Sequence, residues 1–437
     1  MAGFNPVLSI EASKCTGCRL CEVACSLVKE GAVNPVWGRI QAVNIPEIPF
    51  HSVVTCLQCG RPYCAEVCPT AALVKDPGDG VVRLIEERCV GCMLCVAACP
   101  YGGIFFSQER GRPLKCDHCG GDPQCVKVCS PGCLSYQDRG SLYDLLVEPP
   151  DLITPGNSAC QGCSVELILR HTLRVLGPDT ILAIPPGCMG GVGICGYGMT
   201  SGAKVPVFFP LLTNIGSMLA GIKLHFERMG REEVKVVAFA GDGGTADAGF
   251  QSLSGAAERG EKILYICYDN EGYMNTGAQR SATTPLGAWT STTPGGKRAR
   301  SKDVAMIMAM HEIPYTATAN PAFLEDFTKK LKKAMEAVKE GMAYIHIFTS
   351  CPTGWKFSPA KAIEVCRLAV ETNYFPLWEA ERGRFRITVK IDNPKPVREY
   401  TRNIGKFDHL MEEDVIELQR LVDARYSRLL ALEAGWS

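Results

Sequence analysis

The sequence predicts a chain of two domains. The first, over residues 1–150, is a small cysteine-rich α+β domain; the second, over residues 151–437, is an α/β domain with a parallel sheet and flanking helices. Two observations lead to this prediction. Sixteen of the 24 cysteines fall into four groups of four before residue 130. Beyond residue 150, apolar runs that end in glycine or asparagine alternate with stretches of helical spacing, which is typical of strand–helix–strand units.

Composition and charge exclude several classes of protein. The 437 residues are 46% apolar, and 46 basic residues balance 46 acidic ones. A chain with no net charge gives no electrostatic reason to expect nucleic acid or anionic lipid as a partner. Neither a membrane-spanning apolar run nor a signal peptide is found in the sequence. We therefore expect a soluble cytoplasmic protein whose cysteines are reduced and bind metal rather than form disulfides.

The cysteine groups of the first domain have the spacing of iron–sulfur ligands. The first and third follow C-x2-C-x2-C-x3-C, the bacterial ferredoxin spacing. A [4Fe–4S] cluster takes three thiolates from one such group and a fourth from another. Zinc is the alternative, although zinc ribbons use two C-x2-C pairs rather than three close thiolates and a trailing one. The sixteen residues are Cys15, Cys18, Cys21, Cys25, Cys56, Cys59, Cys64, Cys68, Cys89, Cys92, Cys95, Cys99, Cys116, Cys119, Cys125 and Cys129.

The longer gaps in the second and fourth groups resemble the four-cluster electron-transfer subunits of molybdenum oxidoreductases such as formate dehydrogenase. In that family the two outer groups share their clusters, and so do the two inner groups. Spacing alone also permits pairing of the first group with the second. Cys133 is left over and is expected to be a packed thiol. The resemblance implies four ligand sets: Cys15/Cys18/Cys21/Cys129, Cys25/Cys116/Cys119/Cys125, Cys56/Cys59/Cys64/Cys99 and Cys68/Cys89/Cys92/Cys95.

The second domain begins after a linker, residues 151–158. Residues 281–303 lack apolar periodicity and predict a long loop, which is either a lid or a surface insertion. Asn214 is expected to cap the helix that follows it. Outside the central stretch described next, helices are predicted from Val165 to Leu176 and from Gly216 to Phe226, and strands from Ile181 to Ile184 and from Ala343 to Phe348.

One strand–helix–strand unit has the residues of a metal-bridged diphosphate site. An apolar run ends on Gly241-Asp242-Gly243-Gly244, and a second ends on Asp269-Asn270-Glu271-Gly272. Ligands of such sheets bind at the carboxyl ends of the strands, where glycines let the backbone approach a phosphate. Asp242 and Asn270 supply oxygen ligands of the kind that Mg²⁺ takes beside phosphates. A glycine turn in an ordinary α/β domain is the alternative.

Four further cysteines lie where strands of the second domain end or its first helix begins. Cys160 and Cys163 precede the first helix, whereas Cys188 and Cys351 each follow a strand. They could converge on one cluster, although a buried structural thiol is the default for Cys188 or Cys351 taken alone. We expect Cys195, Cys267 and Cys366 to be packed thiols, and His225, His311 and His346 to be structural.

The central stretch resembles the thiamine diphosphate fingerprint, GDG followed by a downstream Asn. Its continuation, Tyr273 to Gln279, resembles the YxNTGxQ run of 2-oxoacid:ferredoxin oxidoreductase β subunits, and residues 160–163, 187–188 and 351–355 match their cluster motifs. The resemblance covers residues 151–437, with segments near 396–410 similar to a C-terminal arm that reaches over a partner. It implies that thiamine diphosphate and Mg²⁺ bind at Gly241, Asp242, Gly243, Gly244, Asn270, Gly272, Asn275 and Thr276, with Asn275 facing the substrate, and that Cys160, Cys163, Cys188 and Cys351 bind a fifth [4Fe–4S] cluster.

The resemblance implies a subunit that oxidatively decarboxylates a 2-oxoacid to its acyl-CoA and passes electrons through five clusters. A fused four-cluster domain is similar to the multisubunit phenylglyoxylate dehydrogenase type, in which electrons go on to a flavin and NAD subunit. The Glu that activates thiamine must come from an α subunit, and a γ subunit is also implied. The alternatives are an enzyme for pyruvate or another 2-oxoacid that reduces ferredoxin, a polyferredoxin electron carrier, and a non-redox thiamine lyase or synthase.

Overall fold

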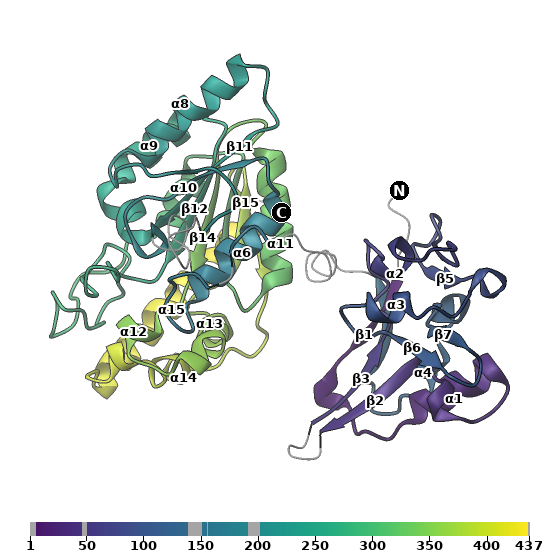
Figure 1. Cartoon of the computed structure of the whole chain (residues 1–437). Coiled ribbons are helices and arrows are strands. Elements are labelled where there is room, and N and C mark those ends of the chain that lie inside the picture. The colour runs from purple at the N-terminus through teal and green to yellow at the C-terminus, as the bar shows by residue number, and fades with distance from the viewer. Residues whose placement is uncertain (1–5, 46–49, 139–150, 155, 191–201, 436–437) are drawn as a thin grey trace. The chain divides into compact units, whose positions relative to one another are not determined.

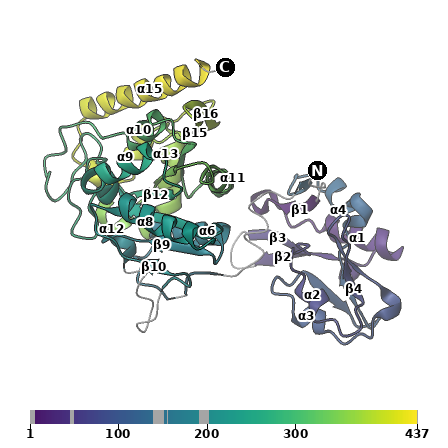
Figure 2. The same ribbon diagram turned by 90° about the horizontal axis from the view of Figure 1, so that it is seen from above.

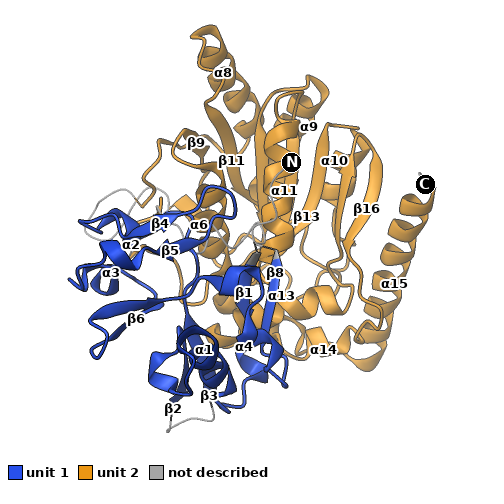
Figure 3. Cartoon of the chain, turned by 90° about the vertical axis from the view of Figure 1, so that its right-hand side faces the viewer, with its two compact units in different colours: residues 1–149 blue, residues 150–437 orange. Residues whose placement is uncertain are grey.

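The computed structural model describes the chain except residues 1–5, 46–49, 139–150, 155, 191–201 and 436–437. The chain divides into two compact units, Met1–Pro149 and Pro150–Ser437, coloured separately in Figure 3. The division lies one residue from the boundary expected from the sequence. Among the residues described, no helix is long and apolar enough to cross a membrane.

The first unit is built from antiparallel strand pairs and short helices (Figure 1). Its first and last strands pair with each other, so the two ends of the unit meet in one small sheet. The strand pairs are β1 (Pro6–Ile10) with β8 (Leu134–Asp138), β2 (Ile40–Ile45) with β3 (Phe50–Thr55), β4 (Leu73–Lys75) with β5 (Val82–Leu84), and β6 (Ile104–Ser107) with β7 (Arg112–Lys115). The helices are α1 (Leu20–Glu30), α2 (Tyr63–Glu66), α3 (Leu94–Ala97) and α4 (Gln124–Lys127).

Cysteines make up much of the interior of the first unit. In one group of nine packed buried residues, five are predicted cluster ligands and only four are aliphatic. A second group contains Cys95 and three aliphatic residues. Such small apolar groups bury little surface, so the free energy that holds this unit together must come largely from what the cysteines bind.

The second unit is organised around an eight-stranded sheet in the order β10-β9-β11-β12-β14-β13-β15-β16. The first six strands run parallel, and the last two add an antiparallel edge. The central strands are buried along their whole length, as expected for a sheet covered on both faces. The strands are β9 (Thr180–Ala183), β10 (Val207–Phe208), β11 (Lys235–Gly241), β12 (Leu264–Asp269), β13 (Tyr315–Ala319), β14 (Ala343–Phe348), β15 (Leu377–Glu381) and β16 (Arg384–Val389).

Helices cover both faces of this sheet (Figures 1 and 2). Alternate residues of β11 point to opposite sides, because Phe239 packs with α6 and α11 whereas Ala238 packs with α8, α9 and α10. A third apolar group joins α13, α14 and α15. The helices are α6 (Ser164–Leu176), α8 (Ile215–Arg228), α9 (Phe250–Glu258), α10 (Val304–Met310), α11 (Leu324–Ala337), α12 (Pro352–Trp355), α13 (Ala362–Glu371), α14 (Arg398–Thr401) and α15 (Glu412–Ala434).

Two details differ from the sequence expectation. Asn214 lies at the N-terminus of α8, but its side chain makes no capping bond; the Ser217 amide is instead satisfied by Ser252 Oγ at 2.9 Å. A wide helical turn, Gly243–Ala248, precedes α9 and was not predicted. The segment that resembles a C-terminal arm packs against its own unit through the buried Tyr400, and its reach over a partner stays a prediction.

Candidate functional site

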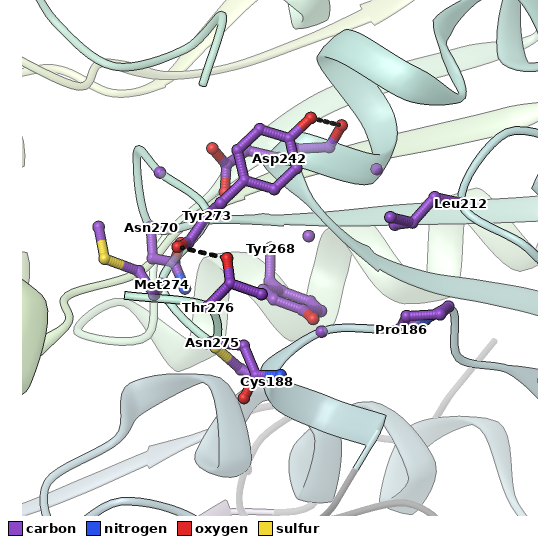
Figure 4. A pocket seen from close by; sticks show the side chains of 15 residues that line it. Pro186, Cys188, Leu212, Asp242, Tyr268, Asn270, Tyr273, Met274, Asn275 and Thr276 are labelled. Carbon is purple, nitrogen blue, oxygen red and sulfur yellow. Dashed lines mark hydrogen bonds between the residues drawn. The ribbon is translucent and has the colours of Figure 1, made fainter. Parts of the chain in front are cut away.

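A cavity of about 120 Å³ lies at the carboxyl ends of β11 and β12 (Figure 4). All eight residues predicted to bind the diphosphate cofactor line it. The loop after β9 and one cysteine of the predicted fifth cluster set form part of the same wall. The lining residues are Pro186, Gly187, Cys188, Leu212, Gly241, Asp242, Gly243, Gly244, Tyr268, Asn270, Gly272, Tyr273, Met274, Asn275 and Thr276.

Glycine at position 243 is required by a close approach of Tyr273. A Cβ added to Gly243 would lie 2.3 Å from Tyr273 Cε1, which no side chain tolerates. The Tyr273 hydroxyl donates to the Gly243 carbonyl oxygen at 3.0 Å. The segment after β12 is therefore held against the turn after β11, and both strand ends face one cavity (Figure 4).

Three oxygens beside the cavity fit a divalent cation. The Asn270 amide lies between Asp242 Oδ1 and the Gly272 carbonyl oxygen, and its NH₂ group can donate to them at 3.1 and 2.9 Å. If the amide turns by half a rotation, its oxygen takes the place of the NH₂ group. The oxygens of Asp242, Asn270 and Gly272 then face one another with no proton between them. The oxygen and nitrogen of such an amide are assigned from its hydrogen bonds. Hard oxygen ligands of this kind are those that Mg²⁺ prefers.

A buried hydroxyl links two carboxylates behind this site. Thr283 Oγ1 lies 2.9 Å from Asp242 Oδ2 and 2.9 Å from Asp269 Oδ1. Burial and the charge of Asp269 raise the pKa of Asp242 well above its ordinary value. A bound cation would reverse this effect, because its charge stabilises the ionised carboxylate. Thr283 belongs to the long loop 281–303, which therefore supports the site from outside the cavity.

His346 balances the second carboxylate. Its Nε2 lies 2.9 Å from Asp269 Oδ2, and its Nδ1 lies 2.7 Å from the Tyr344 hydroxyl. Burial alone would raise the pKa of Asp269, but hydrogen bonds from His346, the Glu271 amide and Thr283 bring it below its ordinary value. Burial alone would lower the pKa of His346, but Cys267 and Asp269 raise it well above its ordinary value. The two groups form a buried ion pair.

A second buried ion pair lies on the other side of Asn270. Lys406 pairs with Glu271, which also accepts from the Tyr374 hydroxyl at 2.7 Å. The Lys406 ammonium lies 3.4 Å from the centre of the Trp355 ring, and Trp355 Nε1 donates to the Asn270 carbonyl oxygen at 2.9 Å. The predicted metal ligand is thus held by the short helix that follows Cys351.

The four cysteines of the predicted fifth set converge. Burial, followed by the neighbouring Cys351, Cys163 and Cys160 thiols, raises the pKa of Cys188 to about 12. Cys163 and Cys160 act on Cys351 in the same way. The loop that carries Cys160 and Cys163 turns at Gly162, whose φ is +71°. Because Cys188 also lines the main cavity, the set lies beside the diphosphate site.

Three of the four predicted ligand sets in the first unit each line a separate small cavity. The residues brought together are Cys15/Cys18/Cys21/Cys129, Cys25/Cys116/Cys119/Cys125 and Cys56/Cys59/Cys64/Cys99. These are the groupings that the resemblance implies. None of the three sets combines a cysteine of the first group with a cysteine of the second group. Within the described residues, no three His, Cys, Asp or Glu side chains are arranged to hold a single metal ion.

The fourth set is brought together in part. Burial raises the pKa of Cys95, and the nearby Cys89 and Cys92 thiols raise it further. Cys68 accepts a hydrogen bond from the Ala72 amide at 3.2 Å, and its place in the set stays a prediction.

Cys133 is buried, as expected for a packed thiol, but it lines the cavity of the first set. The other cysteines expected to be packed are Cys195, Cys267 and Cys366. Cys267 and Cys366 are fully buried. Cys195 lies outside the described residues.

His118 supplies an orphaned polar group at one of these cavities. Its side chain is 1% exposed, and neither ring nitrogen has a hydrogen-bond partner among the described residues. It lines the cavity formed by Cys25, Cys116, Cys119 and Cys125. A buried ring N–H needs an acceptor, and the sulfides of an iron–sulfur cluster are acceptors. The residues present therefore fit a cluster at this position.

Several site residues were not predicted. Thr283, Lys406 and His118 were not named as site residues, because each reaches its partner only through the folded chain. Thr283 does lie in the predicted loop 281–303, and Lys406 lies in the segment that resembles a C-terminal arm. His346 was expected to be structural, and its ion pair with Asp269 agrees with that expectation while placing it beside the site. Trp355 lay within a recognised motif, but its bond to Asn270 could not be foreseen.

Two protein families match the chain. The family described as thiamine pyrophosphate enzyme, C-terminal TPP binding domain, matches residues 162–347. The 4Fe-4S dicluster domain matches residues 50–139. The first match contains the cavity with its surrounding glycines, and the second contains the second, third and fourth cysteine groups.

Curated relatives match over long stretches. The NADH-dependent phenylglyoxylate dehydrogenase subunit beta of Aromatoleum evansii is 46% identical over 424 residues, covering 95% of each chain. Pyruvate synthase subunit PorB of Methanothermobacter thermautotrophicus is 45% identical over 279 residues, covering 63% of this chain and 96% of its own. Ketoisovalerate oxidoreductase subunit VorB of Pyrococcus abyssi is 44% identical over 289 residues, covering 63% and 92%.

Proposed function

Because this chain belongs to the thiamine-diphosphate-binding β subunits of the 2-oxoacid oxidoreductases, we propose that it takes part in converting phenylglyoxylate to its acyl-CoA. The balanced reaction is 2-oxoacid anion plus coenzyme A giving acyl-CoA, CO₂, one proton and two electrons. The single observation that favours phenylglyoxylate is the match to the phenylglyoxylate relative, which spans both units of this chain. The pyruvate and ketoisovalerate relatives match 63% of it.

The cavity residues have distinct roles in this proposal. Asp242 and Asn270 hold Mg²⁺ through side-chain oxygens, and Gly272 adds its carbonyl. The backbone around Gly241, Gly243 and Gly244 receives the diphosphate, since glycines permit its close approach. Asn275 and Thr276 are exposed at the cavity, where Asn275 meets the substrate. When bound, thiamine diphosphate supplies the carbon nucleophile that makes decarboxylation possible.

Five [4Fe–4S] clusters carry the electrons in this proposal. The cysteine set that includes Cys188 lies beside the cavity, where a cluster that it held would take up electrons one at a time. The four sets of the first unit then pass them to an acceptor. The acceptor is a flavin and NAD subunit in the phenylglyoxylate case and ferredoxin in the pyruvate case. The shared cavities in the first unit and the orphaned ring of His118 support the placement of clusters there.

Partner subunits complete the site in this proposal. Thiamine enzymes require a glutamate from a pyrimidine-binding domain, and the second unit of this chain contains one mixed sheet among its described residues. An α subunit would supply that glutamate and close the cavity over Asn275, and a γ subunit would complete the complex. We expect the chain expressed alone to show no turnover.

An anaerobic assay of the purified complex tests the proposal. The complex is supplied with coenzyme A and an artificial electron acceptor, and phenylglyoxylate, pyruvate, 2-oxoglutarate and indolepyruvate are compared by kcat/KM. We expect phenylglyoxylate to exceed the others by at least about tenfold, a difference of about 1.4 kcal/mol in transition-state binding. A preference for pyruvate would replace the substrate assignment while keeping the reaction class.

Thiamine diphosphate content separates this enzyme from an electron carrier whose α/β unit only docks a partner. We expect about one thiamine diphosphate per chain in the complex, and none after Asp242→Ala substitution. A complex that has all its iron but no thiamine diphosphate would favour the carrier. Iron that is absent from the purified complex would contradict the cluster assignments.

A further inference from the structure

A buried lysine lines the cavity of one predicted cluster set of the first unit and directly precedes a cysteine of another. Lys115 is the last residue of β7, and its side chain is 6% exposed. Its Nζ lies 2.8 Å from Cys56 Sγ and 3.1 Å from the Cys116 carbonyl oxygen. Cys56 belongs to the set Cys56/Cys59/Cys64/Cys99, whereas Cys116 belongs to the set Cys25/Cys116/Cys119/Cys125. One ammonium group therefore contacts the sulfur of the former set and the backbone of the latter.

The surroundings of Lys115 fix this position. The ammonium also donates to the Val82 carbonyl oxygen at 3.2 Å and to Gln58 Oε1 at 3.3 Å. Gln58 is itself held, because its Nε2 donates to the Cys116 carbonyl oxygen at 2.8 Å and its Oε1 accepts from the Val82 amide at 2.8 Å. No carboxylate is among these contacts. The charge of the ammonium is balanced by thiolate sulfur and by backbone and amide oxygens.

The contacts of Lys115 are those of an ammonium group. All four atoms around its Nζ are hydrogen-bond acceptors, and a charged lysine has only donors to offer them. Within a low-dielectric interior such a charge acts strongly on any neighbouring change of charge.

We propose that Lys115 raises the reduction potential of the cluster bound by Cys56, Cys59, Cys64 and Cys99. This inference depends on the proposed clusters. Adding one electron to a [4Fe–4S]²⁺ cluster makes it [4Fe–4S]⁺, with no bond broken and no proton required, and the electron comes from the neighbouring reduced cluster. A cation that donates to a ligand sulfur stabilises the more negative, reduced state. Charge-assisted hydrogen bonds of this kind are stronger than neutral ones.

The position of Lys115 bears on electron transfer among the four predicted clusters of the first unit. The first and fourth cysteine groups share two clusters, and the second and third groups share the other two. Lys115 and Gln58 join one cluster of each pair through Cys56 and Cys116. Lys115 would thus make the cluster bound by Cys56 the more favourable place for an electron that passes between the two pairs.

Redox titration of the purified complex, monitored by electron paramagnetic resonance, tests the proposal. Lys115→Met removes both charge and hydrogen bond, Lys115→Gln keeps a donor without the charge, and Lys115→Arg keeps the charge. Lys127→Met is the matched control, because Lys127 is an exposed lysine paired with Asp122. Iron is counted in every sample. We expect one midpoint to fall in the Met variant, with at least a tenfold loss of the reduced form at fixed potential, about 59 mV for one electron.

The remaining variants separate the possible results. Lys115→Gln should shift the same midpoint in the same direction, and Lys115→Arg should largely preserve it. If the Lys115→Met variant loses iron, the midpoint measured for the Lys115→Gln variant decides whether Lys115 has the proposed role. Unchanged midpoints in samples with full iron would overturn the role of Lys115 and leave the clusters in place, as would an equal shift in Lys127→Met. Wild-type complex without iron in the first unit would instead overturn the cluster assignment, and the role of Lys115 with it.

Discussion

At the scale of single residues, the thiamine site depends on small groups in crowded places. Gly243 lies against the Tyr273 ring, and the Asn270 amide lies between two oxygens that a cation would share with it. A larger side chain at position 243, or a differently charged one at position 270, would leave no room for the ligand.

Gly243→Ala should abolish the site. The added Cβ would lie 2.3 Å from Tyr273 Cε1, and such overpacking costs about 1–3 kcal/mol. We expect at least tenfold weaker binding of thiamine diphosphate by calorimetry in the complex. The double variant with Tyr273→Ala should regain part of the affinity. Gly221→Ala in α8, where an added Cβ meets nothing within 4 Å, is the control. Unchanged affinity in Gly243→Ala would refute the steric account.

The pair of Asp269 and His346 predicts a pH dependence of stability. The pKa of Asp269 is lowered in the folded state, so its contribution is present above its unfolded value, about 3.9, and is lost as pH falls through the folded value. The pKa of His346 is raised, so its contribution is present below about 6.5 and is lost as pH rises through the folded value. The ion pair therefore contributes most to the free energy of unfolding between about pH 4 and 6.5.

His346→Gln tests this dependence. Breaking a buried pair costs about 3–5 kcal/mol, because one charge is left uncompensated. We expect the melting temperature of the variant to fall furthest below that of the wild type between about pH 4 and 6.5, and the gap to narrow at alkaline pH. Asp269→Asn combined with His346→Gln should be less destabilised than His346→Gln alone. A gap that is constant with pH would contradict the ion pair.

Sequence could predict the residues whose role is local. Asp242 and Asn270 were found because each directly follows an apolar run, and the carboxyl ends of neighbouring parallel strands meet. Lys406 and His346 were not found, because their partners Glu271 and Asp269 lie 135 and 77 residues away in the chain. Nothing in the composition of a segment indicates which distant carboxylate it will reach.

At the scale of elements, neighbouring parallel strands carry the site. β11 and β12 are neighbours, and β12 pairs with β14 in register from Leu264 with Ala343 to Asp269 with Phe348. The cysteine after β14 is thereby brought to the edge where the diphosphate site lies. The strand positions were predictable from apolar runs, whereas the wide turn before α9 was not, because it depends on the packing of Gly249 against Leu212 and Gly244.

Gly162→Ala should remove the fifth cluster alone. Gly162 has a φ of +71°, and an added Cβ would lie 2.6 Å from the Pro359 carbonyl oxygen. The turn that carries Cys160 and Cys163 would have to shift, and we expect iron per chain to fall by about four. Cys366→Ala, which removes a buried thiol outside the set, should leave the iron content unchanged. Full iron in Gly162→Ala would contradict the assignment of this loop.

At the scale of the whole molecule, the two units differ in what stabilises them. The second has extensive apolar groups on both faces of its sheet, whereas the first packs cysteines among a few aliphatic residues. The crowding of sixteen cysteines before residue 130, against the apolar runs beyond residue 150, already indicated this difference. The sequence could not predict Lys115 or His118 between the cysteine groups, because those contacts arise only when the groups fold together.

Removal of iron should therefore unfold one unit and spare the other. After anaerobic chelation, we expect amide hydrogen exchange to increase strongly across β1 to β8. Exchange in β11, β12 and β14 should change little, because their core does not depend on a cluster. Exchange that increases equally in both units, or in neither, would show that the first unit is held together in another way.

In the proposed function, electrons leave the thiamine site through the clusters of this chain. The visible absorbance of the purified complex tests this, with the complex mixed anaerobically with phenylglyoxylate and coenzyme A in the absence of any acceptor. We expect rapid bleaching of the iron–sulfur absorbance in the wild type, and none in an Asp242→Ala complex that keeps its iron. A wild-type complex that holds thiamine diphosphate and full iron, yet bleaches with none of the four 2-oxoacids, would contradict it.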